Sequence, residues 1–230
     1  MPNLILVGLP DPKVPSSWKP ETPDFDAYAI SFRPLKRVVW FIGRGYLEMD
    51  PKDLAVVRQL AQKFPNIVGV IMDDFFRFTL DGSEVGNRTP GELAYIRNRL
   101  QVEGRKLDLW MTLYDHNLKY EIVPYLHHVD VASYWTGNAK DLEKLEEGFE
   151  ELEKAMPGLR KVLGCYMWDY GSHSPMPVAL MQKQCELGLK WLREGRIEGM
   201  IFLGSGNCDL DLKAVEWTRD WIQKVGDEKL

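Results

Sequence analysis

Cysteine is scarce in this sequence of 230 residues, which contains three in all. Cys165, Cys185 and Cys208 lie far apart, and no pair has the CxxC spacing that is typical of a structural zinc site. Three scattered cysteines do not make a disulfide framework, so we expect reduced thiols that mostly pack in the interior. Reduced thiols fit the cytoplasm, but a chain whose leader has been removed fits another compartment, and the sequence leaves the localisation open.

The chain also lacks an excess of positive charge and a long apolar run. Lys and Arg number 29 against 34 Asp and Glu, which gives a formal net charge of −5. This balance offers no general attraction to nucleic acid or to an anionic membrane, and we expect neither as a partner. The apolar run near the N-terminus, residues 4–9, has no basic flank and is too short for a signal peptide or a bilayer span. The oligomeric state stays open.

Several signatures of ligand-binding sites are missing as well. The first apolar run leads into "GLPDPK", without the GxGxxG or GxxxxGK[ST] patterns of nucleotide-binding loops. Residues 204–207 read "GSGN", which is not the GxSxG elbow of serine hydrolases. Backbone amides of such a loop can bind phosphate, but the acidic residues around it argue against an anionic ligand. No compact HxH or HExxH pattern occurs, and we expect neither a cofactor nor a resident metal ion.

Seven apolar runs are present, and they alternate with helical patterns. Most runs are continuously hydrophobic rather than alternating with polar residues, as in parallel strands that are covered on both faces. The expected strands are residues 4–9, 37–43, 67–73, 107–115, 129–135, 161–169 and 197–204.

The helical patterns carry recognisable end signals. Thr89 and Glu92 have the spacing of a capping box, and Asp50 before Pro51 predicts another helix start. Asp209 or Asp211 is the expected N-cap of the last helix. The expected helices are residues 25–32, 50–65, 89–100, 117–128, 138–158, 177–195 and 211–225.

The regular alternation of strand and helix is that of βαβ units. No flexible linker divides the chain, so we expect a single domain over residues 1–230. A doubly wound open sheet is disfavoured by the missing Gly-rich turn, whereas polar residues after several strands favour a barrel with a site at its C-terminal rim. The predicted fold class is α/β, a TIM-type (β/α) barrel. Seven strands are counted; an eighth either precedes residue 1 in a longer chain or is missed by this pattern.

Acidic and large aromatic residues follow five of the apolar runs, at the rim where a (β/α) barrel carries its active site. A single acid at a strand end is usually a helix cap, but five such ends together predict a functional site. The predicted catalytic residues are Asp73, Asp74, Asp115 and Asp169, and the predicted substrate-binding residues are Tyr114, His116, Tyr134, Trp135, Trp168, Tyr170 and Asn207.

Paired carboxyl groups and aromatic platforms suit glycoside hydrolysis, in which one carboxylic acid protonates the leaving oxygen and another acts as nucleophile or base. If the strand stays regular to its end, adjacent residues point to opposite faces, so only one of Asp73 and Asp74 faces the barrel mouth. We expect Asp73 and Asp169 to be the catalytic pair, with Asp115 as the alternative partner. Aromatic neighbours of Asp169 should lower its solvation and raise its pKa towards that of a general acid.

The stretch Gly69–Phe76, "GVIMDDFF", carries a resemblance. With a Gly four residues before an acid at the end of the third strand, the chain resembles the broad class of glycoside-hydrolase-like TIM barrels. Chitinase-like and polygalactosaminidase-like barrels have a similar strand ending. The resemblance implies a carbohydrate substrate and an inward-facing Asp73. The full series of acids of the chitinase type is absent, because Ile71 and Phe75 stand two positions before and after Asp73.

The lead prediction is therefore a carbohydrate-active hydrolase, and two alternatives stay open. Asp73 or Asp74, with Asp115, His116 and His173, could hold a divalent ion in an isomerase, aldolase or lyase that acts on a small polyol or sugar. In a non-catalytic sugar-binding barrel, the same aromatic residues would stack on sugar rings and the acids would only accept hydrogen bonds from hydroxyl groups.

Overall fold

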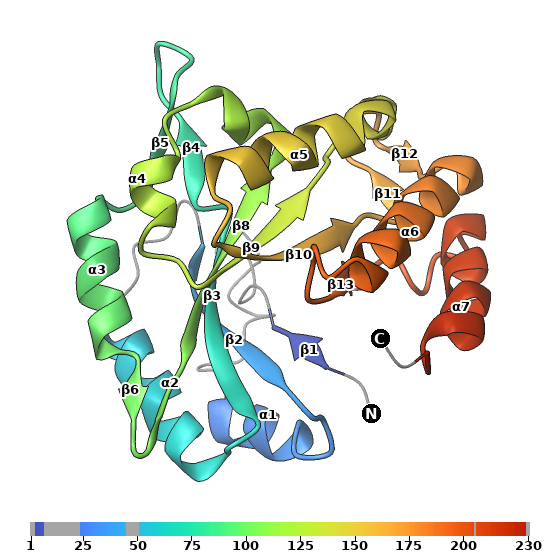
Figure 1. Ribbon diagram of the computed structural model, residues 1–230. Helices are drawn as coiled ribbons and strands as arrows, with labels where there is room; N and C mark the ends of the chain where they lie inside the picture. The colour runs from blue at the N-terminus through green and yellow to red at the C-terminus, as the bar shows by residue number, and fades with distance from the viewer. Residues whose placement is uncertain (1–2, 7–23, 45–50, 205, 229–230) are drawn as a thin grey trace, which may run out of the picture. The chain divides into compact units, whose positions relative to one another are not determined.

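The computed structural model describes residues 3–6, 24–44, 51–204 and 206–228 (Figure 1). The expected helix cap Asp50 and the end of the first expected strand lie outside these ranges. The chain divides into two compact units, each of which is described by itself. Unit 1 comprises residues 1–112 and 124–130, and unit 2 comprises residues 113–123 and 131–230. The single domain therefore stays a prediction.

Within the described residues, the main sheet contains seven strands. They are β1 (Leu4–Ile5), β2 (Val38–Arg44), β3 (Ile67–Asp73), β8 (Asp108–Tyr114), β9 (Val131–Trp135), β10 (Arg160–Cys165) and β13 (Met200–Phe202). Their order in the sheet, β1-β2-β3-β8-β9-β10-β13, is also their order along the chain, and the pairs within each unit are parallel. Parallel strands in chain order, with helices in the connections, confirm the α/β fold class of a TIM-type barrel, with the seven strands that the sequence predicts.

Unit 1 has the helices α1 (Phe25–Ser31), α2 (Pro51–Lys63), α3 (Pro90–Arg99) and most of α4 (Val123–Leu126). The capping box of α3 is confirmed, since Thr89 Oγ1 accepts from the Glu92 amide at 3.2 Å and Glu92 Oε2 accepts from the Thr89 amide at 2.7 Å. This exchange satisfies two amide groups that a helix start leaves without a partner.

Two short antiparallel hairpins lie in the described part of unit 1. The first is formed by β4 (Phe76–Phe78) and β5 (Glu84–Gly86), and the second by β6 (Gln101–Val102) and β7 (Arg105–Lys106). The first hairpin begins directly after β3, and Phe75 at its base is only 2% exposed. The rings of Phe75 and Phe76 pack edge-on against Tyr125 of α4, at centroid distances of 5.7 and 5.4 Å. The two aromatic residues of "DDFF" thus anchor a hairpin.

Unit 2 has the helical segments η2 (Asp115–Lys119), η3 (Ala139–Lys144), α5 (Leu145–Ala155), α6 (Val178–Arg193) and α7 (Lys213–Val225). Its core joins α5 to α6 through aromatic packing, because Phe149 stacks on Trp191 at 4.2 Å between ring centroids. Tyr134 of β9 packs edge-on against Phe149 at 6.0 Å, and this contact fixes α5 against the sheet.

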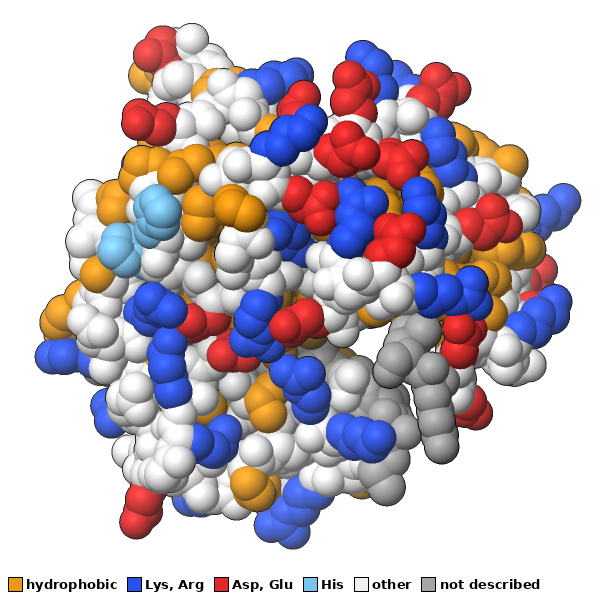
Figure 2. All heavy atoms as spheres, in the orientation of Figure 1, with side chains coloured by type: hydrophobic (Ala, Val, Ile, Leu, Met, Phe, Trp, Pro, Cys, Tyr) orange, Lys and Arg blue, Asp and Glu red, His pale blue; other side chains and the backbone are white. Residues whose placement is uncertain are grey.

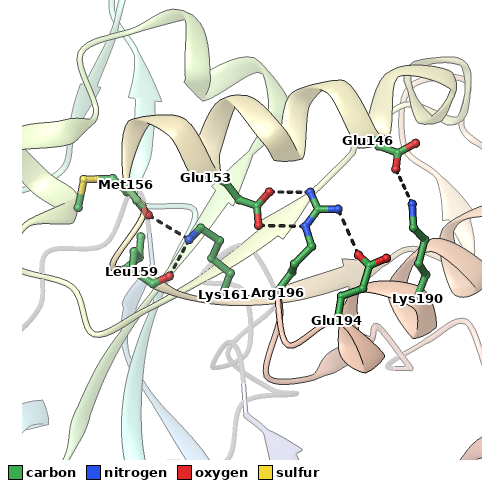
Figure 3. A network of polar contacts seen from close by, with 8 residues as sticks. All are labelled: Glu146, Glu153, Met156, Leu159, Lys161, Lys190, Glu194 and Arg196. Carbon is green, nitrogen blue, oxygen red and sulfur yellow. Dashed lines mark hydrogen bonds and ion pairs between the residues drawn. The ribbon is translucent and has the colours of Figure 1, made fainter. Parts of the chain in front are cut away.

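A network of polar contacts lies near the start of β10 (Figure 3). Arg196 forms a bidentate ion pair with Glu153, with nitrogen–oxygen distances of 2.6 and 3.1 Å. Lys161 is 4% exposed, and its Nζ donates to the carbonyl groups of Met156 and Leu159 at 3.0 and 2.7 Å. Burial lowers the pKa of this ammonium group. Figure 2 shows acidic and basic side chains intermixed over α5 and α6, in keeping with such pairing.

Two details of unit 2 differ from the sequence predictions. The expected strand 161–169 ends at Cys165 as part of the main sheet, and Trp168–Asp169 forms β11, an antiparallel partner of β12 (Ser174–Pro175). Directly after β10, the Tyr166 carbonyl accepts from Gln184 Nε2 of α6 at 3.2 Å instead of from a neighbouring strand. The N-cap of α7 is Leu212, so the predicted caps Asp209 and Asp211 were wrong. Asp211 has a left-handed backbone, with φ of +49°, and belongs to the preceding turn.

No helix in the described ranges combines the length and the hydropathy needed to cross a membrane.

Candidate functional site

The end of β9 places Trp135 across the neighbouring strand β10. Tyr134 pairs with Leu163, which brings Trp135 level with Gly164. A Cβ atom on Gly164 would lie 1.9 Å from Cδ2 of the indole, so glycine is the residue that leaves room for the ring. Trp135 Nε1 donates to Ser133 Oγ at 3.0 Å, which fixes the indole on this face of the sheet.

Trp135 belongs to a group of five rings in unit 2 that we call the aromatic cluster: Tyr114, His116, Trp135, Tyr166 and Tyr170. The Tyr166 ring lies 4.6 Å from Trp135 and 4.8 Å from Tyr170. Tyr114 and His116 stack in parallel at 5.4 Å, and the Tyr166 hydroxyl donates to the Tyr114 hydroxyl at 3.5 Å. Trp135 and Tyr166 are buried, whereas Tyr170 is 44% exposed. The cluster therefore has a buried floor and an exposed edge.

Asp115 supplies a carboxylate beside this cluster. It begins η2 between Tyr114 and His116, and its Oδ1 accepts from the His116 amide at 2.9 Å. His116 Nδ1 lies 3.5 Å from the same oxygen. The Asp115 side chain is partly exposed, so it keeps contact with solvent. The pKa of Tyr134 is raised, first by burial and then by the negative charges of Asp115 and Glu151.

Asp169 is held by four hydrogen-bond donors. Its Oδ1 accepts from the amides of Ala139, Gly171 and Ser172 at 3.1, 2.9 and 3.3 Å, and its Oδ2 accepts from the Ser172 hydroxyl. Burial raises the pKa of Asp169, but the hydroxyl of Ser172 and the three amides outweigh burial and lower the pKa overall. The expected rise in pKa was wrong in direction, because these donors replace the lost water. Asp169 is therefore ionised at neutral pH, and the role of general acid does not suit it.

The remaining predicted residues of unit 2 lie in different surroundings. Tyr134 is 1% exposed and faces α5, where a Cβ atom on Gly148 would lie 2.4 Å from its hydroxyl, so it offers no surface to a ligand. Trp168 is half-buried in the β11–β12 hairpin, opposite Pro175. Asn207 is 8% exposed, and its Nδ2 is buried without a hydrogen-bond partner among the described residues, so its predicted contact with substrate stays a prediction.

In unit 1, Asp73 and Asp74 differ in backbone conformation. Thr112 is level with Asp73 in the β3–β8 register, and its buried hydroxyl donates to Asp73 Oδ1 at 2.9 Å. Asp74 has a left-handed backbone, with φ of +48°, which turns the chain at the end of the strand. Asp74 thus leaves the regular strand conformation that the alternation of side chains assumes, so the opposite orientation of the two acids stays a prediction. The hydrogen bond from Thr112 helps to orient Asp73. The pairing of Asp73 with Asp169 stays a prediction.

Two residues that matter here were missed in the sequence. Tyr166, the centre of the aromatic cluster, stands two positions after Gly164, and this spacing places it on the same face as the glycine that Trp135 covers. The same alternation separates Tyr134 from Trp135, because neighbours in a strand face opposite sides. Thr112, the partner of Asp73, lies inside an apolar run without a distinguishing pattern.

The structure gives no direct support to the metal hypothesis. Within the described part of the chain, no three or more His, Cys, Asp or Glu residues are grouped so that they could hold a metal ion. Asp115 and His116 are adjacent, but they contact each other, and His173 lies in the β11–β12 hairpin loop.

Comparisons with known proteins give no family. No protein-family model matches the chain, and no curated protein matches it. Among solved structures, a proposed alpha-L-fucosidase from Bacteroides thetaiotaomicron is 9% identical, with a TM-score of 0.49, over 96% of this chain and 90% of that one. A 2,3-dimethylmalate lyase is 14% identical, with a TM-score of 0.47, over 89% of this chain and 66% of that one. A glycoside hydrolase domain from Bordetella bronchiseptica is 11% identical, with a TM-score of 0.37, over 66% of this chain and 57% of that one. The chain thus spans less than two thirds of the length of the last two, and likenesses of this degree identify no reaction.

Proposed function

We propose that this chain is a carbohydrate-active hydrolase that cleaves glycosidic bonds. The observation that carries the proposal is the aromatic cluster of unit 2, with a partly exposed carboxylate, Asp115, beside it. Aromatic faces present large apolar surfaces with little conformational freedom, which suits packing against the apolar faces of sugar rings. Glycoside hydrolysis generally requires a pair of carboxyl groups from Asp or Glu residues.

Asp115 and Asp73 are the leading candidates for the carboxyl groups. Asp115 lies at the cluster and remains open to solvent. Asp73 ends β3 in unit 1, where the Thr112 hydroxyl donates to its Oδ1 and helps to orient the carboxylate for proton transfer or attack. Asp74 is the weaker candidate of that unit. Asp169 would act as a base or nucleophile if it took part, since its donors favour the ionised form.

A screen with aryl glycosides and polysaccharides, followed by single replacements, tests this proposal. Asp115→Asn and Asp73→Asn preserve shape and remove the charge, and we expect each to lower turnover by about 10²–10⁴-fold. Asp220→Asn, on the exposed face of α7, is the matched control and should leave turnover unchanged. Full activity in both Asp115→Asn and Asp73→Asn would remove these residues from the mechanism. Addition of a chelator should have no effect, whereas a metal-dependent lyase or aldolase would lose activity.

A second candidate is a sugar-binding protein without catalysis. One observation favours this candidate. Asp169 adjoins the aromatic cluster, but its lowered pKa does not suit a general acid. In that case oligosaccharides would bind to the wild-type protein and to Asp115→Asn with similar affinity, and no glycoside in the screen would be cleaved.

A further inference from the structure

The carboxylate of Asp169 joins two loops that are distant in the sequence. Ala139 belongs to the segment that follows β9, whereas Gly171 and Ser172 belong to the loop of the β11–β12 hairpin. One oxygen atom, Oδ1, accepts amide hydrogen bonds from both loops. A carboxylate that accepts from several amides is a strong local tie, because charge-assisted hydrogen bonds are stronger than neutral ones.

Two further contacts tighten the same junction. A Cβ atom on Gly171 would lie 1.5 Å from Oδ1 of Asn138, so the backbone at Gly171 packs directly against the loop after β9. The Ser172 hydroxyl, which donates to Asp169, also lies 2.7 Å from the Ser174 hydroxyl. The hairpin loop is therefore fixed at consecutive positions on the C-terminal side of residue 170.

Tyr170 stands between Asp169 and Gly171, the two fixed positions. Its ring meets Tyr166 edge-on, with an interplanar angle of 64°, and its remaining surface is open. A half-exposed ring has few packing partners of its own, so the backbone on either side determines where it lies.

We propose that Asp169 is a positioning residue whose carboxylate holds Tyr170 at the exposed edge of the aromatic cluster, where Tyr170 contacts the substrate. The contact with substrate rests on the proposed function, whereas the link between Asp169 and Tyr170 does not. Asp169 acts through Tyr170 and takes no part in bond cleavage.

The two replacements Asp169→Asn and Asp169→Ala separate positioning from catalysis. An Asn side chain keeps an oxygen that can accept from the three amides, and the Ser172 hydroxyl can turn to accept from the new amide group. Alanine removes every acceptor. A positioning role therefore predicts a mild effect of Asn and a larger effect of Ala, whereas a catalytic carboxylate is lost in both variants.

The test measures KM and kcat with whichever aryl glycoside the screen identifies, or the dissociation constant of the oligosaccharide if no glycoside is cleaved. We expect Asp169→Ala to raise KM or the dissociation constant by about ten-fold, the size of one aromatic contact, with kcat nearly unchanged. Asp169→Asn should change either constant by less than about three-fold. In a Tyr170→Ala background, Asp169→Ala should have no further effect, because the ring on which it acts is gone. Asp220→Ala is the matched control.

A second measurement needs no ligand. Fluorine NMR of protein labelled with 3-fluorotyrosine, with the Tyr170 signal assigned through Tyr170→Phe, should show that signal shifted in Asp169→Ala and nearly unmoved in Asp169→Asn. An unmoved signal in Asp169→Ala would overturn the inference, as would a loss of kcat by orders of magnitude in Asp169→Asn. If the wild-type protein binds and cleaves no carbohydrate while the signal still shifts, the proposed function fails and the link between Asp169 and Tyr170 stands.

Discussion

Two stretches of this chain combine acidic and aromatic residues but bury them differently. Each places an acid next to an aromatic residue after a strand: Asp73-Asp74-Phe75-Phe76 in unit 1 and Trp168-Asp169-Tyr170 in unit 2. In unit 1 the acids are half-buried and Phe75 is buried. In unit 2 the acid is buried and Tyr170 is exposed. What differs is the partner that each side chain finds.

The contacts of these side chains explain why the aromatic residue is buried in one stretch and the acid in the other. Phe75 has Tyr125 and the backbone of Gly86 to pack against, so its ring is buried as the base of a hairpin. Asp169 accepts hydrogen bonds from three amides and a hydroxyl, and these bonds compensate the buried carboxylate for the loss of hydration. Asp73, which accepts from the Thr112 hydroxyl, is half-buried and stays partly in solvent. An acid followed by an aromatic residue therefore indicates a site only when the ring stays open.

The largest effect that separates the two stretches should come from truncating their aromatic residues. Phe75→Ala removes a buried ring and should cost about 3–5 kcal/mol of the free energy of unfolding. Tyr170→Ala should cost less than about 1 kcal/mol, because much of that ring is already in water. Urea denaturation of both variants measures the difference, and equal losses would contradict the distinction between an anchoring ring and an open one.

A middle-sized effect is expected from the donor to Asp73. Thr112→Val keeps the shape of the side chain and removes the hydroxyl, and we expect a loss of about 1–2 kcal/mol in the free energy of unfolding. Ser133→Ala, which removes the buried acceptor of the Trp135 indole, is the corresponding change in unit 2. If Thr112→Val proves as stable as wild type, the hydrogen bond to Asp73 contributes nothing to folding and its value lies in orienting the carboxylate.

The smallest effect is a pH dependence. The pKa of Asp169 is lowered in the folded protein, so its contribution is present above the ordinary value of 3.8 and is lost as the pH falls through the folded value. The stability difference between wild type and Asp169→Asn should therefore be constant from pH 7 to about pH 5 and shrink below about pH 4. Unfolding midpoints at successive pH values measure it, and a difference that grows on acidification would show the wrong sign for a lowered pKa.

The sequence predicts the scaffold better than the surroundings of single side chains. Continuous apolar runs mark the strands because both faces of a parallel sheet are covered, and β3 occupies residues 67–73 as expected. The run 161–169 misleads, because hydrophobicity continues past Cys165 although Gln184, distant in the sequence, binds the Tyr166 carbonyl. The lowered pKa of Asp169 could not be predicted from the sequence for a similar reason, since one of its donors, the Ala139 amide, belongs to another loop. Local patterns cannot show which backbone amides converge on a carboxylate.

The bare backbone at Gly164 also bears on how this protein could be engineered or could diversify. Any side chain there would enter the space of the Trp135 ring, so the floor of the aromatic cluster depends on a hydrogen atom at one position. A library meant to alter ligand preference should leave residue 164 fixed and vary residue 170, where the side chain borders solvent. Substitutions that spread among natural descendants of this chain would be subject to the same restriction, with change tolerated at the edge of the cluster and refused beneath it.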